Sequence, residues 1–186
     1  MNERIVTDEQ IMMQVKDGGL RQLALLFERY QVPIYRYFLQ TLQDQTLSED
    51  LTQNVFERII KYRHSFRDDS IFKHWIFSIA RNVRHDHYRS NQFTVPWEGQ
   101  ENEERAYSAE EQLVHVEDNG KLHRALNQLD PEYREVLILT RFEDMKYKEV
   151  AKIMGCTEGT IKSKVHRAIQ KLKHLYLKEE AYENLG

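Results

Sequence analysis

Apolar residues recur at every third or fourth position through most of this chain, as in LRQLALLFERYQVPIYRYFLQTL, which begins at residue 20. This spacing places apolar side chains on one face of an α-helix, whereas a strand requires strict alternation. Only 7 Gly and 3 Pro interrupt the 186 residues, and no segment stands out as rich in β-forming residues. The sequence therefore predicts an all-α protein.

The negative charge of the chain is concentrated in one central segment. Residues 91–120 contain eight Asp or Glu and one Arg, and the helical spacing of apolar residues is lost there. Such a composition is typical of a solvated linker. We therefore expect two small helical domains. The predicted boundaries are a first domain over residues 1–92, an acidic flexible linker over 93–118, a second domain over 119–178 and a tail over 179–186.

The sequence lacks the signatures of several protein classes. No apolar run approaches the roughly 20 residues that span a bilayer, so we expect a cytoplasmic protein without membrane insertion. Cys156 is the single cysteine, which rules out an internal disulfide. No Gly-rich phosphate loop, HExxH motif or nucleophile with its base is found, so neither an enzyme nor a cofactor is expected. His85 and His87 would point about 200° apart on a helix, which argues against a metal site.

The second domain is predicted to contain a helix-turn-helix motif. Asp130 and Pro131 suit the N-cap and the first turn of a helix. Further along, Gly155 ends the short helix YKEVAKIM, and Thr157 can cap the next helix, EGTIKSKVHRAIQKL. The lengths of these two helices and the glycine between them match a helix-turn-helix.

The second helix of this motif has an apolar face and a polar, basic one. At 100° per residue, one stripe about 100° wide contains Ile161, Val165, Ala168, Ile169 and Leu172. The opposite side contains Ser163, His166, Arg167 and Gln170. Lys162 and Lys164 flank that side, where ammonium groups can reach phosphates. The pattern predicts a DNA recognition helix, with a solvated amphipathic helix as the alternative.

A second polar surface lies on the predicted helix LSEDLTQNVFERIIKY, residues 47–62. Its inner face is expected to consist of Leu47, Leu51, Val55, Ile59 and Ile60. Its outward side offers carboxylates and carboxamides at Glu49, Asp50, Gln53, Asn54 and Glu57. Such a surface could contact a basic groove of a partner, although spacing alone favours a plain solvated face.

The segment SIFKHWIFSIARNVRHDHYRSNQ mixes cations with aromatic rings. Core side chains are predicted at Ile71, Trp75, Ile76, Ile79, Ala80 and Val83. The cations are Lys73, Arg81, Arg84 and Arg89, and the rings are Phe72, Trp75, Phe77 and Tyr88. Cations that follow a phosphate backbone, beside rings on which bases stack, suit unpaired nucleic acid. Several rings, Trp75 among them, are expected to belong to the core instead.

Four motifs, in order and with fitting spacing, resemble the extracytoplasmic-function (ECF) group of bacterial sigma factors. They are SEDLTQNVF, FKHWIFSIARNVRHDHYR, LDPEYREVLIL and YKEVAKIMGCTEGTIKSKVHRAIQKL, and the resemblance spans nearly the whole chain. Members of this group keep two helical domains, called regions 2 and 4. The resemblance implies a transcription initiation factor that binds core RNA polymerase and promoter DNA and that opens the DNA strands without consuming ATP.

The resemblance also implies roles for residues of the first domain. The first motif would bind the clamp helices of the polymerase β′ subunit through Glu49, Asp50, Gln53 and Asn54. Asn54 departs from the acidic residue that is common at its position in the group. The minus-10 element would be opened by Asn82, as a base contact, and by Arg81, Arg84 and Arg89 near the backbone. Asp86 is expected to form an ion pair within the bundle.

In the second domain, the resemblance implies that the recognition helix reads the minus-35 element. The matching residues are Lys162, Ser163, Lys164, His166 and Arg167. The polymerase β flap and an anti-sigma factor are further partners that members of the group have.

Two other classes remain as alternatives at this point. A free-standing helix-turn-helix regulator that binds DNA as a dimer would explain residues 121–173, but it would leave SEDLTQNVF and the basic, aromatic helix without a role. A nuclease or recombinase with a DNA-binding tail would need clustered catalytic acids, which the sequence does not show.

Overall fold

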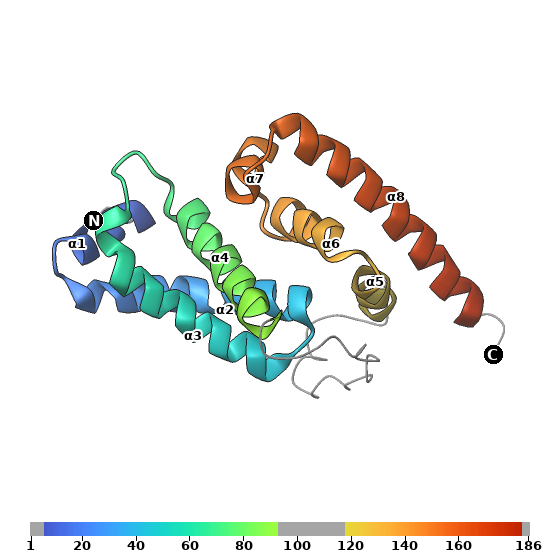
Figure 1. The fold of residues 1–186 in the computed structure, drawn as a ribbon, viewed down its shortest axis with the longest axis horizontal. Coiled ribbons are helices and arrows are strands. Elements are labelled where there is room, and N and C mark those ends of the chain that lie inside the picture. The colour runs from blue at the N-terminus through green and yellow to red at the C-terminus, as the bar shows by residue number, and fades with distance from the viewer. Residues whose placement is uncertain (1–5, 93–117, 184–186) are drawn as a thin grey trace, which may run out of the picture.

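The computed structural model describes residues 6–92 and 118–183, and every regular element within these two ranges is helical (Figure 1). The all-α prediction is confirmed. The predicted acidic linker lies outside the described residues except for its last position, Asp118, where a helix begins.

The first described range folds as a helical bundle. Its α-helices are α1 (Asp8–Lys16), α2 (Leu23–Leu42), α3 (Gln45–Tyr62) and α4 (Phe72–Gln92). Asp44 caps α3, because its carboxylate accepts the backbone N–H of Leu47 at 3.0 Å. Just before it, Gln43 ends α2 in the left-handed conformation, with φ of 60°. This tight reversal lets α2 and α3 pack against each other as a helical hairpin.

The core of this bundle is rich in aromatic rings. Phe72 and Phe77 are fully buried, and the ring of Phe77 meets that of Tyr37 edge-on at a centroid distance of 5.7 Å. Trp75 packs against Phe66 at 5.3 Å, as predicted for a core ring. Of the four rings that the sequence interleaves with cations, Tyr88 is the exposed one. Phe72 and Phe77 stabilise the bundle and are not free to stack on bases, and Trp75 is partly buried against the same core.

Two isoleucines that the sequence placed in this core lie at the surface. Ile60 is 39% exposed and Ile71 is 49% exposed. Ile60 follows the fully buried Ile59, so it is turned about 100° away from the centre of the buried stripe. Ile71 precedes the first residue of α4, so the helical spacing does not fix the direction of its side chain.

The second described range is dominated by one long helix. Its elements are α5 (Asp118–Asn127), α6 (Pro131–Leu137), a π-helical turn (Ile138–Phe142), α7 (Tyr147–Met154) and α8 (Glu158–Glu183). Helix α8 packs along α5, α6 and α7, as the red ribbon in Figure 1 shows. Ile161, Val165 and Ala168 are buried in this contact, whereas Ile169, predicted to share their stripe, is 41% exposed at its edge.

The predicted helix ends are correct at both sides of the turn between α7 and α8. Gly155 takes a left-handed conformation, with φ of 67°, which a residue without a Cβ adopts at little cost. Thr157 then caps α8, because its hydroxyl oxygen accepts the N–H of Thr160 at 3.1 Å. Asp130 occupies the N-cap position of α6, but its side chain does not cap the helix. Its carboxylate instead pairs with Lys171 of α8 at 2.5 Å.

The two described ranges, called the first and second halves of the chain below, contact each other directly. Helix α4 lies against α7 (Figure 1), and α2 contacts α6. A buried arginine, Arg134, takes part in this contact. Its guanidinium donates to the carbonyls of Leu126, near the end of α5, and of Leu129, just after it, both at 3.0 Å. It also donates to the carbonyl of Thr41 in α2 at 3.5 Å. A cation is favourable at a helix C-terminus, where the free carbonyls point outward.

Candidate functional site

The outward face of α3 is exposed where the sequence predicted it. Glu49, Asp50 and Gln53 all lie at the surface. Asn54 is half-buried, and its side-chain oxygen accepts a hydrogen bond from Nε of Arg58 at 2.9 Å. Thr52, in the same motif, is buried and donates to the carbonyl of Ser48, so it belongs to the core. Three of the four predicted residues therefore form one open polar surface.

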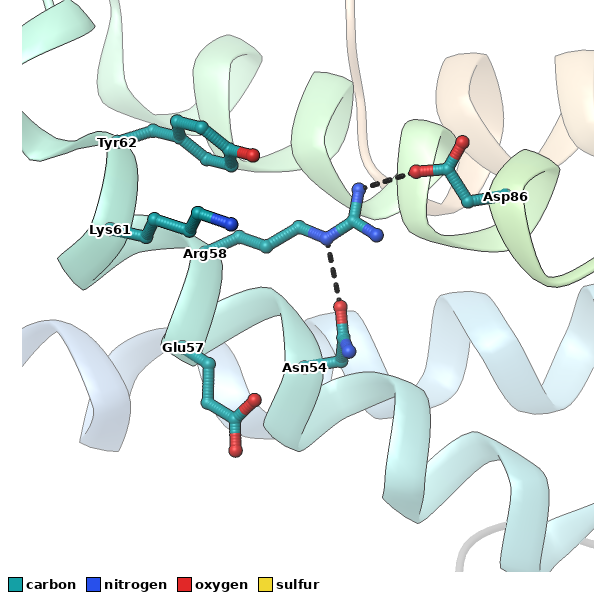
Figure 2. A pocket seen from close by; sticks show the side chains of 6 residues that line it. All are labelled: Asn54, Glu57, Arg58, Lys61, Tyr62 and Asp86. Atoms are coloured by element: carbon teal, nitrogen blue, oxygen red, sulfur yellow. Dashed lines mark hydrogen bonds and ion pairs between the residues drawn. The ribbon is translucent and has the colours of Figure 1, made fainter.

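An open hollow lies beside this surface, between α3 and α4. Figure 2 shows Arg58 at its centre, with dashed lines to Asn54 and Asp86. Arg58 donates to Asp86 at 2.7 Å, so the ion pair predicted for Asp86 is confirmed and its partner is identified. Glu57 points away from the guanidinium (Figure 2). The role of Arg58 was missed from the sequence, although its spacing of four residues from Asn54 allows their contact on a helix.

The four predicted strand-opening residues of α4 divide into two pairs. Asn82 and Arg89 are exposed, and Arg89 donates to Asp86 at 3.1 Å. Arg81 is half-buried and Arg84 is buried, and both face the second half of the chain. The structure therefore does not bring the four side chains together on one open surface.

Arg81 and Arg84 meet a carboxylate that the sequence did not single out. Glu135 of α6 is 2% exposed, and its oxygens lie 2.6 Å from Nη2 of Arg84 and 3.4 Å from Nε of Arg81. The hydroxyl of Tyr37, in α2, donates to the same carboxylate at 2.7 Å. Burial raises the pKa of Tyr37, and the charge of Glu135 raises it further, so this hydroxyl keeps its proton.

Two more acids of the second half contact basic side chains of α4. Lys73 donates to the backbone carbonyl of Glu143 at 2.6 Å and lies 3.2 Å from its carboxylate. His74 places Nε2 at 3.3 Å from the carboxylate of Glu149 in α7. Together with Glu135, these contacts join α4 to α6, to the turn after it and to α7.

The predicted recognition surface on α8 is mostly open. Lys162, Ser163, His166 and Arg167 are exposed, on the side away from the buried stripe. Lys164 is half-buried, and its ammonium group pairs with Glu132 of α6. Four of the five predicted residues are therefore accessible to a ligand, and the fifth is occupied within the protein.

Two further kinds of site were searched for in the described ranges. No group of three or more His, Cys, Asp or Glu side chains within residues 6–92 and 118–183 is arranged to hold a metal ion. Among the helices of the same ranges, none combines the length and the apolar character that a membrane span needs.

Comparison with known proteins identifies relatives of both halves. The chain matches the family model of Sigma-70 region 2 over residues 26–94 and that of Sigma-70 region 4 over residues 119–172. It is 34% identical to the ECF RNA polymerase sigma factor SigM of Bacillus subtilis, covering 81% of this chain and 93% of that protein. It is 30% identical to the ECF RNA polymerase sigma factor SigX of the same organism, covering 84% of each.

Solved structures show the same architecture. A chain in the structure of CnrH in complex with the cytosolic domain of CnrY matches with a TM-score of 0.69 at 23% identity, over 90% of this chain and 96% of that one. A chain in the co-crystal structure of the sigma factor RpoE with the anti-sigma factor NepR from Bartonella quintana matches with a TM-score of 0.64 at 25% identity, over 83% of this chain and 96% of that one.

The contact between His74 and Glu149 yields a prediction for solution. Burial lowers the pKa of His74, and although the Glu149 carboxylate raises it, Lys152 and Lys73 lower it again, so that it lies below 6.5. The unfolded chain then binds the proton more tightly, so the stability that His74 contributes is lost as the pH falls below 6.5. The Glu149 carboxylate favours the protonated form of His74. Glu149→Gln removes this charge and should lower the titration midpoint of His74 further, as followed by NMR.

The matched control for this titration is Glu57→Gln, an exposed carboxylate on α3. This substitution should leave the midpoint of His74 where it is. A His74 midpoint that Glu149→Gln also leaves unchanged would show that α4 and α7 are not in contact in solution.

Proposed function

Because the chain belongs to the ECF group of RNA polymerase sigma factors, it is a transcription initiation factor, and we propose that it acts in the cytoplasm, without enzymatic activity, by bringing core polymerase to promoters. The observation that carries this proposal is the order of region 2 and region 4 along two helical halves. A free-standing helix-turn-helix regulator would account for the second half alone, so it is not favoured.

The exposed face of α3 is the proposed contact with core polymerase. Glu49, Asp50 and Gln53 present acceptors and two negative charges to solvent, which complements a basic surface. We assign this face to the β′ clamp helices, with Asn54 contributing at its edge. The second half of the chain is assigned to a contact with the β flap of the polymerase.

The exposed side of α8 is the proposed reader of the minus-35 element. The second helix of a helix-turn-helix motif enters the major groove of DNA with its polar side facing the bases. Arg167 lies exposed on this side and can donate two hydrogen bonds to a guanine edge, while Lys162, at its margin, is assigned to a phosphate. Ser163 and His166 lie between them, and Lys164 contributes when it leaves Glu132.

Helix α4 is the proposed reader of the minus-10 element in its opened form. Asn82 is exposed and carries both a donor and an acceptor, as a base edge requires. Arg89 lies farther along the same helix, near the backbone of the captured strand. Arg81 and Arg84 join them only after their contact with Glu135 is broken.

An anti-sigma factor is proposed as a further partner. The similar RpoE chain was solved together with the anti-sigma factor NepR, which supports a partner of that class for this chain.

Transcription in vitro tests the proposed function as a whole. Core polymerase would be supplied with a library of bacterial promoter sequences, with and without this protein. Promoter-specific transcripts that depend on the protein are expected. Transcripts that are identical with and without it would contradict the proposal.

The α3 assignment predicts the effect of removing its acceptors. Asp50→Ala combined with Gln53→Ala should weaken binding to core polymerase by about tenfold or more, since loss of about 1.4 kcal/mol of binding energy is a tenfold change. Affinity would be measured by fluorescence anisotropy of labelled protein. Glu28→Ala, an exposed acid on α2, is the control and should bind as the natural chain does. If the double variant binds core polymerase as tightly as the unsubstituted chain, α3 is not part of the interface.

The assignment of Asn82 predicts a defect that depends on the state of the DNA. Asn82→Ala should slow open-complex formation on duplex promoters and have less effect on promoters whose minus-10 region is already unpaired. Permanganate reactivity of unpaired thymines reports the opening. An equal loss on both templates would argue against a role in strand capture.

The assignments of Lys162 and Arg167 predict different effects on promoter binding by the holoenzyme. Lys162→Ala should reduce the slope of the logarithm of the binding constant against the logarithm of the salt concentration by about 0.9, without a change of sequence preference. Arg167→Ala should cost about 1–3 kcal/mol of discrimination at one base pair. Binding would be measured across salt concentrations and single-base variants of the minus-35 element. The reverse pattern would exchange the two roles.

A further inference from the structure

One glycine lies in the first turn of α8, the proposed reader of the minus-35 element, and the fold does not require it. Gly159 is the second residue of α8 and is exposed. Among the described residues, a Cβ added there would meet one atom within 4 Å, Oγ1 of Thr157 at 3.9 Å. Its φ lies outside the left-handed region, unlike the 67° of Gly155. Alanine would therefore fit at this position without strain.

The glycine is also not needed to shape the start of the helix. Thr157 fixes the first turn, since its hydroxyl oxygen accepts the N–H of Thr160 at 3.1 Å and its carbonyl accepts that of Ile161 at 3.1 Å. Inside a helix, Gly is less favourable than any residue except Pro, because it loses the most backbone entropy on folding. Gly159 therefore lowers the helix propensity of α8 without serving the fold, which is typical of a position where a ligand approaches the backbone closely.

Gly159 lies on the side of α8 that is turned away from the protein. At about 100° per residue, it lies about 160° from the buried Ile161. It lies within about 40° of Ser163, His166 and Gln170, all of which are exposed. These four residues form a line along the exposed side of the helix, which we call the central line of α8.

The side chains of the central line become longer toward the C-terminal end of α8. Gly159 has none, Ser163 ends one atom beyond Cβ, and those of His166 and Gln170 extend further. The major groove is about 12 Å wide and about 8.5 Å deep, and a helix with its side chains is about 10–12 Å across. The side chains that face the bases therefore decide how deep such a helix sits. On the central line they let the N-terminal end of α8 lie closest to the bases.

We propose that the missing Cβ of Gly159 lets the first turn of α8 rest against the base edges of the minus-35 element, at the depth where the short Ser163 side chain can hydrogen-bond to a base. This inference rests on the proposed role of α8 in reading that element. Gly159 is then a positioning residue for Ser163, which lies one turn further along the helix. A larger residue would hold the first turn away from the bases, so that Ser163 would lose its contact while longer side chains still reach the DNA.

Gly159→Ala tests this role by adding one methyl group. Binding of the holoenzyme would be measured to a promoter duplex and to the same duplex with a scrambled minus-35 element, so that effects on the rest of the complex cancel. The substitution should lower the preference for the intact promoter by about tenfold. It should not lower the midpoint of thermal unfolding, because Ala favours a helix more than Gly does. A lower midpoint, or an unchanged preference, would overturn the inference.

The matched control is Gly120→Ala, which adds the same methyl group to the first turn of another helix. Gly120 is the third residue of α5 and is exposed. A Cβ there would meet Nη1 of Arg124, the end of a long side chain, at 3.4 Å. This variant should leave the preference for the intact promoter unchanged. An equal loss in both variants would contradict the proposal, because the effect would then not be local to α8.

A double-mutant cycle tests the link between Gly159 and Ser163. Ser163→Ala should lower the preference for the intact promoter in the unsubstituted chain. It should have little further effect in the Gly159→Ala chain, because there Ser163 no longer reaches its base. Residues that act together show such non-additive losses. Additive losses would contradict the positioning role.

Failure of the proposed function shows differently in the same experiment. The unsubstituted chain would then give a holoenzyme without any preference for the intact minus-35 element. Failure of this inference alone leaves that preference in place and removes only the response to Gly159→Ala.

Discussion

The contact on which the arrangement of this protein depends is the buried carboxylate of Glu135 between Arg81, Arg84 and Tyr37. A buried ion pair adds little net stability compared with apolar packing, but breaking it by removing one partner is costly. Such a contact specifies one geometry without making it very strong. It therefore suits a junction that holds two helical halves together and that can also open.

The surfaces proposed for polymerase and for duplex DNA are accessible in this structure, whereas part of the surface proposed for the opened strand is covered. The acceptors of α3 and most of the polar side of α8 face solvent, while Arg81 and Arg84 of α4 face α6. This division gives an order of events. On the proposed roles, polymerase can be engaged first, and Arg81 and Arg84 become available to the opened strand when their contact with Glu135 is broken.

Local patterns in the sequence predicted most of the fold, because helix faces and caps depend on residues a few positions apart. The turn at Gly155, the cap at Thr157 and the buried stripe of α8 follow from such patterns, and the wrongly placed Ile60, Ile71 and Ile169 lie at the edges or ends of theirs. The role of Glu135 was not predictable in this way. Its partner Tyr37 is 98 residues away, and nothing local distinguishes this acid from a solvated one.

The most direct test of this account is the distance between labels on α3 and α8 in the full chain, recorded free, bound to core polymerase, and in the complete promoter complex. The account predicts a single short distance in the free protein and a long one in the promoter complex. A free protein whose halves are already as far apart as they are on the promoter would contradict it, because Glu135 would then not occupy the arginine site in solution.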